Sequence, residues 1–156
     1  MFVFSEESEK EIERNLAKYP FKKSALLPLL HVAQDQEGYV TPEAMEEIGK
    51  RLDVSPAYVE SVATFYTMFH TRPVGKYVIL FCHNISCKLL GADDLLDYTA
   101  KKLGIEVGGT TTDKKFTLLR EECLAACCGG PMMRVNEDFH EFLTKDKIDK
   151  ILASLP

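Results

Sequence analysis

Two short apolar runs, each followed at once by a pair of cysteines, constrain this chain more than any other feature of its sequence. Residues 77–82 (YVILFC) form a nearly continuous run of β-branched and aromatic residues, which is typical of a strand buried on both faces. Residues 115–120 (KFTLLR) predict a second strand. The cysteines at the ends of these runs and in the loops that follow are Cys82, Cys87, Cys123 and Cys127.

The segment between the two predicted strands indicates how the cysteines come together. A helix is expected over about residues 91–103, with Gly104 as its stop, and a helical crossover favours parallel neighbouring strands. If the strands are parallel, all four sulfurs converge at one edge of the sheet. Loops at such an edge are suited to turning backbone N–H groups towards a bound anion, and a cluster held by four thiolates is anionic.

On spacing alone, four kinds of site compete: an iron–sulfur cluster, a structural zinc ion, a redox dithiol and inert buried thiols. Zinc usually takes C-x2–4-C pairs on tight turns, and one gap of four and one of three residues, in pairs about 35 residues apart, fit that arrangement poorly. The C-x-x-C motif of a thioredoxin-type dithiol is absent from the sequence. A catalytic pair of Cys82 and His83 is disfavoured, because adjacent residues of an extended chain point to opposite sides. Spacing favours the iron–sulfur cluster and leaves the alternatives open.

The fifth cysteine, Cys128, directly follows Cys127, so spacing cannot decide which of the two is a ligand. It is either a packing thiol or an alternative ligand. The N–H groups expected to face the sulfurs belong to Ser86, Ala125, Ala126, Cys128, Gly129 and Gly130.

The composition restricts the class of protein. Five cysteines, an odd number in a chain without an export signal, argue against a disulfide framework. Apolar runs stay well short of the roughly 18 residues of a membrane span. A net charge of −5 argues against nucleic acid as the main partner. We therefore expect a cytoplasmic protein, alone or as a peripheral part of a membrane-bound complex, without direct membrane insertion.

The sequence predicts two regions that meet at Arg72–Pro73–Val74–Gly75, a helical region over residues 1–72 and an α/β region over residues 73–156. Helices are expected over 6–18, 24–36, 42–52 and from Pro56 onwards, the last with Val59, Val62, Ala63, Tyr66 and Phe69 facing inward. The second region reads as β-α-β-β-β-α. Its last elements are a hairpin of 132–136 with 139–143, and a helix capped by Thr144.

These residues resemble a known family. The runs GKYVILFCHNISCKLLGADDLLDY and EECLAACCGGPMMRVNEDFHEFLT are similar to the thioredoxin-like [2Fe–2S] subunit of respiratory complex I, the NADH:quinone oxidoreductase. The upstream run YPFKKSALLPLLHVAQDQEGYVTPEAMEEIGKRL and the segment VESVATFYTMF also resemble the helical part of that family. Related subunits occur in NAD-linked hydrogenases and formate dehydrogenases. The resemblance implies an α/β fold in which an N-terminal helical bundle precedes a thioredoxin-like [2Fe–2S] ferredoxin domain.

The resemblance also implies a function. It places one [2Fe–2S] cluster per chain on Cys82, Cys87, Cys123 and Cys127, so Cys127 rather than Cys128 is the expected ligand. It implies an electron-transfer subunit of NADH:quinone oxidoreductase, next to a partner subunit that binds FMN and NADH. The equivalent subunit of a hydrogenase or formate dehydrogenase is the alternative, and a zinc-stabilised interaction module is a further one. The pair Ala125-Ala126 stands where the family often has glycine, so a positive φ at Ala126 would be strained.

Overall fold

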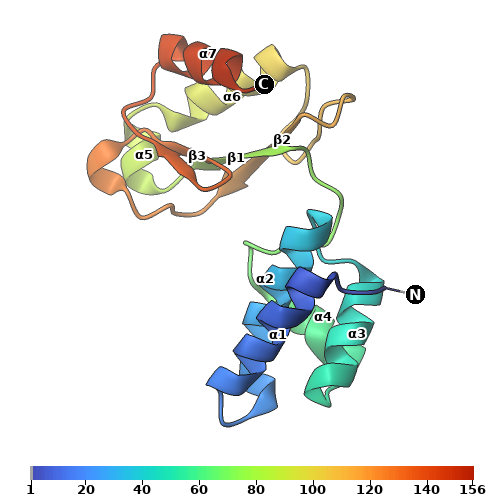
Figure 1. Ribbon diagram of the computed structural model, residues 1–156. Helices are drawn as coiled ribbons and strands as arrows, with labels where there is room; N and C mark the ends of the chain where they lie inside the picture. Colours follow the sequence, from blue (N-terminus) through green and yellow to red (C-terminus); the bar gives the residue numbers. More distant parts are fainter. Residues whose placement is uncertain (1) are drawn as a thin grey trace. The chain divides into compact units, whose positions relative to one another are not determined.

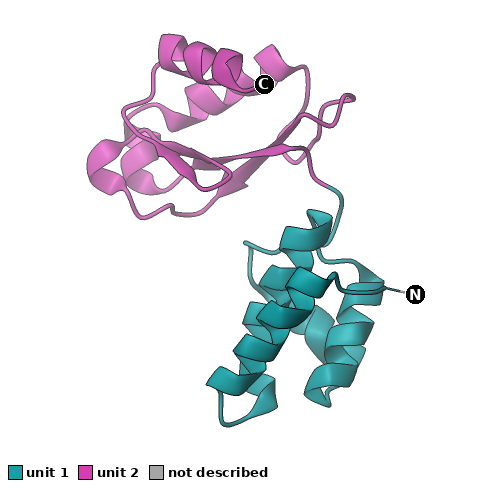
Figure 2. Cartoon of the chain, viewed as in Figure 1, with its two compact units in different colours: residues 1–73 teal, residues 74–156 magenta. Residues whose placement is uncertain are grey.

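The computed structural model describes residues 2–156, which divide into two compact units, one ending at Pro73 and the other spanning Val74–Pro156 (Figure 2). The division lies one residue from the boundary expected between residues 72 and 73. That the two units are separate domains stays a prediction, and each is described by itself.

The first unit is helical, and hydroxyl side chains begin three of its helices. Ser5, Thr41 and Ser55 each accept a hydrogen bond from the backbone N–H three residues further on, which satisfies one of the free N–H groups of a first helical turn. Proline at the first position fits two of these starts, since that N–H has no partner within the helix. The elements are α1 (Glu6–Lys18), a 3-10 turn η1 (Lys22–Ala25), α2 (Leu26–Glu37), α3 (Pro42–Leu52) and α4 (Pro56–Phe65).

Two expectations for this unit were wrong. The helix expected to begin near residue 24 begins as η1, and the α-helix starts only at Leu26. Pro28 thereby falls in the first turn of α2, where its missing N–H breaks no hydrogen bond. Tyr66 does not face inward: α4 ends at Phe65, and Tyr66 is extended and 38% exposed. Phe69 is buried as expected, but it lies beyond the end of the helix.

The interior of the first unit is formed by apolar side chains of all four helices, including the fully buried Leu29, Ile48 and Val59. An ion pair reinforces the packing of α1 with α3, because Arg51 holds both carboxylate oxygens of Glu9 and lowers the pKa of that carboxyl. Most of the stability of this unit must nevertheless come from burial of the apolar faces.

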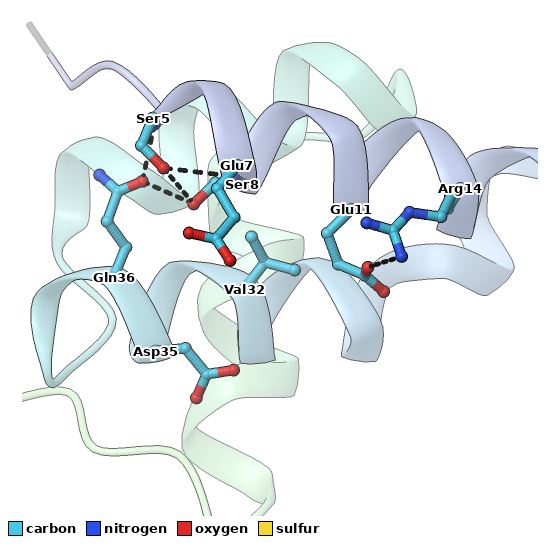
Figure 3. Close-up of a pocket in the computed structure, with 8 residues that line it drawn as sticks. All are labelled: Ser5, Glu7, Ser8, Glu11, Arg14, Val32, Asp35 and Gln36. Atoms are coloured by element: carbon cyan, nitrogen blue, oxygen red, sulfur yellow. Dashed lines mark hydrogen bonds and ion pairs between the residues drawn. The ribbon is translucent and has the colours of Figure 1, made fainter.

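A polar groove of about 380 Å³ lies between α1 and α2 (Figure 3). In it the side-chain oxygen of Gln36 accepts hydrogen bonds from the backbone N–H of Ser5 and the hydroxyl of Ser8, both at 2.9 Å. The groove is confined to the first unit, and none of the residues that line it is a predicted cluster ligand.

The second unit is a four-stranded sheet with two helices on one face (Figure 1). The strand order is β2-β1-β3-β4, with β1 parallel to β2 and antiparallel to β3. On one face of the sheet, Ile79, Phe81 and Leu118 pack against α6 and α7 in a shared core. The elements are β1 (Tyr77–Cys82), α5 (Ile85–Leu89), α6 (Ala92–Leu103), β2 (Phe116–Glu121), a 3-10 turn η2 (Cys127–Gly129), β3 (Met133–Val135), β4 (Asp138–His140) and α7 (Lys145–Ser154).

The mixed α/β prediction is confirmed, and its details need three corrections. The short helix α5 was not expected between β1 and α6. The second strand lies at Phe116–Glu121, one residue later than predicted. The hairpin is shorter than predicted, because Asn136 has a φ of +51° and turns the chain directly after β3. Asparagine tolerates this left-handed conformation, and its side-chain oxygen accepts the N–H of Val78 at 2.9 Å.

No helix among residues 2–156 has the length and apolar character that a membrane crossing requires.

Candidate metal centre

The parallel pairing of β1 and β2 brings the two cysteine pairs to the same edge of the sheet. Cys82, the last residue of β1, lies opposite Glu121, the last residue of β2. The ladder continues for one more hydrogen bond, from the N–H of His83 to the carbonyl oxygen of Glu121 at 3.1 Å. The loops that carry Cys87 and Cys123 therefore both leave this edge, as the crossover argument predicted.

Cys87 is where the two loops meet. Its thiol is buried in α5 and hydrogen-bonds with the thiol of Cys82, which is also buried. Burial, together with the neighbouring sulfurs of Cys82 and Cys127, raises the pKa of Cys87 to about 11. The backbone N–H of Met132 acts in the opposite direction, because it stabilises a negative charge on the Cys87 sulfur. Two other predicted ligands, Cys82 and Cys127, thus lie close enough to Cys87 to affect its pKa.

Cys123 and Cys127 are exposed, unlike Cys82 and Cys87. The sulfur of Cys123 accepts a hydrogen bond from the N–H of Ala125 at 3.3 Å, as expected for a residue beside an anionic sulfur. Cys127 begins the turn η2, and the exposed Cys128 follows it in the same turn. The Nε2 of His83 lies 3.0 Å from a carboxylate oxygen of Glu122.

Two glycines allow the Cys127 loop to pack closely against its neighbours. A Cβ on Gly130 would lie 3.4 Å from the sulfur of Cys87 and 3.1 Å from the Leu90 side chain. A Cβ on Gly129 would lie 2.4 Å from the carboxyl carbon of Glu141, too close without a shift of the surroundings. The absence of side chains at these positions therefore lets the η2 turn approach α5 and the segment after β4.

The four predicted ligands offer the donor chemistry of an iron–sulfur cluster. Among residues 2–156, no three or more cysteine, histidine, aspartate or glutamate side chains are grouped so that they could hold a metal ion. A [2Fe–2S] cluster is held by four cysteine thiolates shared between two irons, and its potential responds to N–H groups near the sulfurs. The N–H groups of Ala125 and Met132 are already placed towards Cys123 and Cys87.

Backbone strain in this loop falls on Ala125, not on Ala126 as anticipated. Ala125 has a φ of +58°, and Ala126 has an unstrained φ of −118°. The left-handed conformation costs a residue with a Cβ about 1–2 kcal/mol, which glycine avoids. The strain accompanies the N–H···S hydrogen bond from Ala125 to Cys123.

Replacing Ala125 by glycine is therefore expected to stabilise the metal-free chain. The relief of strain is partly offset by the greater entropy of glycine in the unfolded chain. The free energy of unfolding should therefore rise by about 0.5–1 kcal/mol. Urea unfolding followed by circular dichroism measures the change. Ala126→Gly is the matched control and should destabilise by about 0.5–1 kcal/mol, because that residue has no strain to lose. Equal shifts of the same sign for both variants would contradict this account.

Sequence reasoning missed three features of the segments around the site. The helix α5 carries Cys87, but its five residues are too few to show a helical period. The N–H of Met132 comes from the segment before β3, and its proximity to Cys87 follows only from the fold. The cis peptide bond between Gly130 and Pro131 was also not anticipated.

Comparison with known proteins adds independent information. Residues 12–156 match the family model described as thioredoxin-like [2Fe-2S] ferredoxin. The chain is 41% identical to an NADH-quinone oxidoreductase subunit of Rhizobium meliloti, over 93% of this chain and 86% of that protein. It is 37% identical to NADH-quinone oxidoreductase subunit 2 of Thermus thermophilus, over 97% of this chain and 86% of that protein.

Among solved structures, an NAD+-reducing [NiFe]-hydrogenase in the air-oxidized state has a similar fold, with a TM-score of 0.73 and 22% identity. The similarity covers 84% of this chain but only 22% of the hydrogenase chain, and it bears on the fold alone. The family that the sequence motifs suggested is thus confirmed by the family model and by relatives that span nearly the whole chain.

Proposed function

Because this chain belongs to the thioredoxin-like [2Fe–2S] ferredoxin family, we propose that it is the [2Fe–2S] electron-transfer subunit of an NADH:quinone oxidoreductase. The observation that carries the proposal is that both cysteine pairs follow the same end of the parallel strands β1 and β2, in a chain that matches the family from residue 12 onwards. We assign Cys82, Cys87, Cys123 and Cys127 as the ligands.

A bound [2Fe–2S] cluster accepts and releases one electron at a time. The residues of the chain would hold the cluster, offset its negative charge and release protons as it assembles. The four cysteines would hold it, and two of them, Cys82 and Cys87, are buried. The N–H groups of Ala125 and Met132 offset the negative charge on the sulfurs. The raised pKa of Cys87 means that this thiol must lose its proton when it binds iron, so cluster assembly should release protons.

A partner subunit is required by the chemistry of the substrate. NADH delivers two electrons as a hydride, so a flavin must divide the pair before a one-electron carrier can accept them. The sequence has no G-x-G-x-x-G phosphate-binding motif of its own. We therefore propose that a subunit binding FMN and NADH supplies the electrons, within a complex peripheral to the membrane on its cytoplasmic side.

The proposal is tested by metal and sulfide analysis of anaerobically purified chain, together with its visible spectrum. We expect about two irons and two sulfides per chain and a red-brown colour that bleaches on reduction. A colourless chain with one zinc would overturn the proposal in favour of an interaction module, because Zn²⁺ has no visible absorption. A chain that stays colourless after reconstitution with iron and sulfide would equally contradict it. NADH-dependent quinone reduction by the isolated complex distinguishes the quinone enzyme from a hydrogenase or formate dehydrogenase.

A further inference from the structure

The segment that follows β4, residues 141–143, runs against the turn η2. The N–H of Phe142 donates to the carbonyl oxygen of Gly129 at 2.6 Å, and the N–H of Leu143 donates to that of Pro131 at 2.8 Å. The side chain of Leu143 is buried in the core formed with α6 and α7. Two hydrogen bonds and one buried side chain therefore hold this segment beside the loop that contains η2.

The start of α7 holds the same segment from its other side. Thr144 caps the helix by accepting the N–H of Lys147 at 3.2 Å. The Nζ of Lys147 turns back and donates to the backbone carbonyl oxygen of Glu141 at 2.6 Å. The backbone of Glu141 is thus fixed between a helix and the cysteine loop, so its side chain has a defined place.

That side chain lies on Gly129. A Cβ on Gly129 would lie 2.6 Å from the Cγ of Glu141, closer than real Cβ atoms come, so the bare glycine leaves room for the glutamate. Gly129 is two residues after Cys127, and a Cβ on the next residue, Gly130, would lie 3.4 Å from the sulfur of Cys87. The glutamate therefore packs against the turn that carries one predicted ligand and passes close to another.

The charge of Glu141 is not offset by a partner. The carboxylate of Glu122, also near the cysteines, lies 3.0 Å from the Nε2 of His83. Glu141 is half-buried, and among residues 2–156 its carboxylate makes no hydrogen bond or ion pair, because Lys147 binds its backbone oxygen. A half-buried charge of this kind is screened less by water and salt than an exposed one.

We propose that the carboxylate of Glu141 lowers the reduction potential of the [2Fe–2S] cluster. Reduction adds an electron to a cluster that four thiolates already make negative, so a further negative charge nearby disfavours the reduced state. A lower potential makes the reduced cluster a stronger donor, which favours passing the electron on over storing it. The proposal rests on the proposed electron-transfer function and names a residue that sets its driving force.

The test is a redox titration of the full-length chain with its cluster, followed by visible absorption under anaerobic conditions. Glu141→Gln keeps the shape of the side chain and removes its charge. At the potential where the wild type is half reduced, the ratio of reduced to oxidised cluster should be at least about threefold higher in this variant. For a one-electron couple, that ratio corresponds to a rise of about 28 mV. Glu141→Asp keeps the charge and should stay close to half reduced.

Glu137→Gln is the matched control, because it removes the same charge from an exposed position in the turn between β3 and β4. In the pairing of β3 with β1, Met133 lies opposite Phe81 and Val135 lies opposite Ile79. Glu137 therefore follows the end of β3 that is remote from the cysteines. Its variant should titrate as the wild type does.

The outcomes separate this proposal from the proposed function. A wild-type potential in Glu141→Gln, with full iron content, would overturn the role of Glu141 and leave the electron-transfer function intact. Loss of iron in Glu141→Gln would assign the side chain to the structure of the loop, and an equal rise in Glu137→Gln would indicate a general effect of net charge; either result would also overturn the proposal. A wild-type chain without iron and visible absorption would contradict the proposed function itself.

Discussion

Replacing Cys123 by serine is expected to abolish the visible absorption of the chain and to lower bound iron and sulfide to less than about a tenth of the wild-type values. Changes outside the ligand sphere already weaken metal binding 10–100-fold, and the loss of a ligand should cost at least as much. Cys123 is the most informative of the four cysteines because it is exposed, so its replacement leaves the core untouched. Cys82 and Cys87 are buried, and their variants would also disturb folding.

Cys128→Ser is the control for this prediction. Cys128 is exposed and lies in the same loop, so it matches Cys123 in chemistry and in accessibility. Its replacement should leave iron, sulfide and spectrum unchanged if Cys127 is the fourth ligand. Loss of the cluster in Cys128→Ser, with retention in Cys127→Ser, would reverse that assignment. Retention of the full cluster in Cys123→Ser would contradict the ligand set as a whole.

The position of the candidate site followed from short-range signals in the sequence. The run at 77–82 has the composition of a buried strand, and the residues between it and the second strand suit a helical crossover. A buried strand followed by a helical crossover favours parallel pairing with the next strand. Parallel strands end on the same side of the sheet, where Cys82 and Glu121 lie opposite each other. The helix starts at Thr41, Ser55 and Thr144 could also be predicted from short segments, because each depends on one hydrogen bond between a hydroxyl oxygen and the N–H three residues further on.

The features that were missed depend on contacts between segments remote in sequence. The left-handed residue of the loop is Ala125, and nothing in an alanine pair distinguishes its members. Met132 offers its N–H to Cys87 only because β3 pairs with β1. Tyr66 was expected inside because the apolar period continues to it, but the helix ends one residue earlier. Local patterns thus located the site, and tertiary packing determined its detailed geometry.

Replacing Leu118 by alanine is expected to destabilise the second unit by about 2–5 kcal/mol, the usual cost of truncating a fully buried leucine. Leu118 is in the middle of β2, with no exposed surface, in the core formed with α6 and α7. Urea unfolding followed by circular dichroism measures the loss. Leu89→Ala removes the same atoms from a side chain that is 80% exposed, and it should change stability by less than about 0.5 kcal/mol.

Hydrogen exchange of the Leu118→Ala variant also tests whether the two units are separate domains. Each unit has its own core, with Leu29 fully buried in the first and Leu118 in the second. If the units fold independently, Leu118→Ala should lower amide protection in Val74–Pro156 and leave the first unit unchanged. Leu29→Ala should have the reverse effect and leave the cluster spectrum intact. Loss of protection throughout the chain in either variant would show one cooperative unit, and the helical region could not then be varied without affecting the ligands.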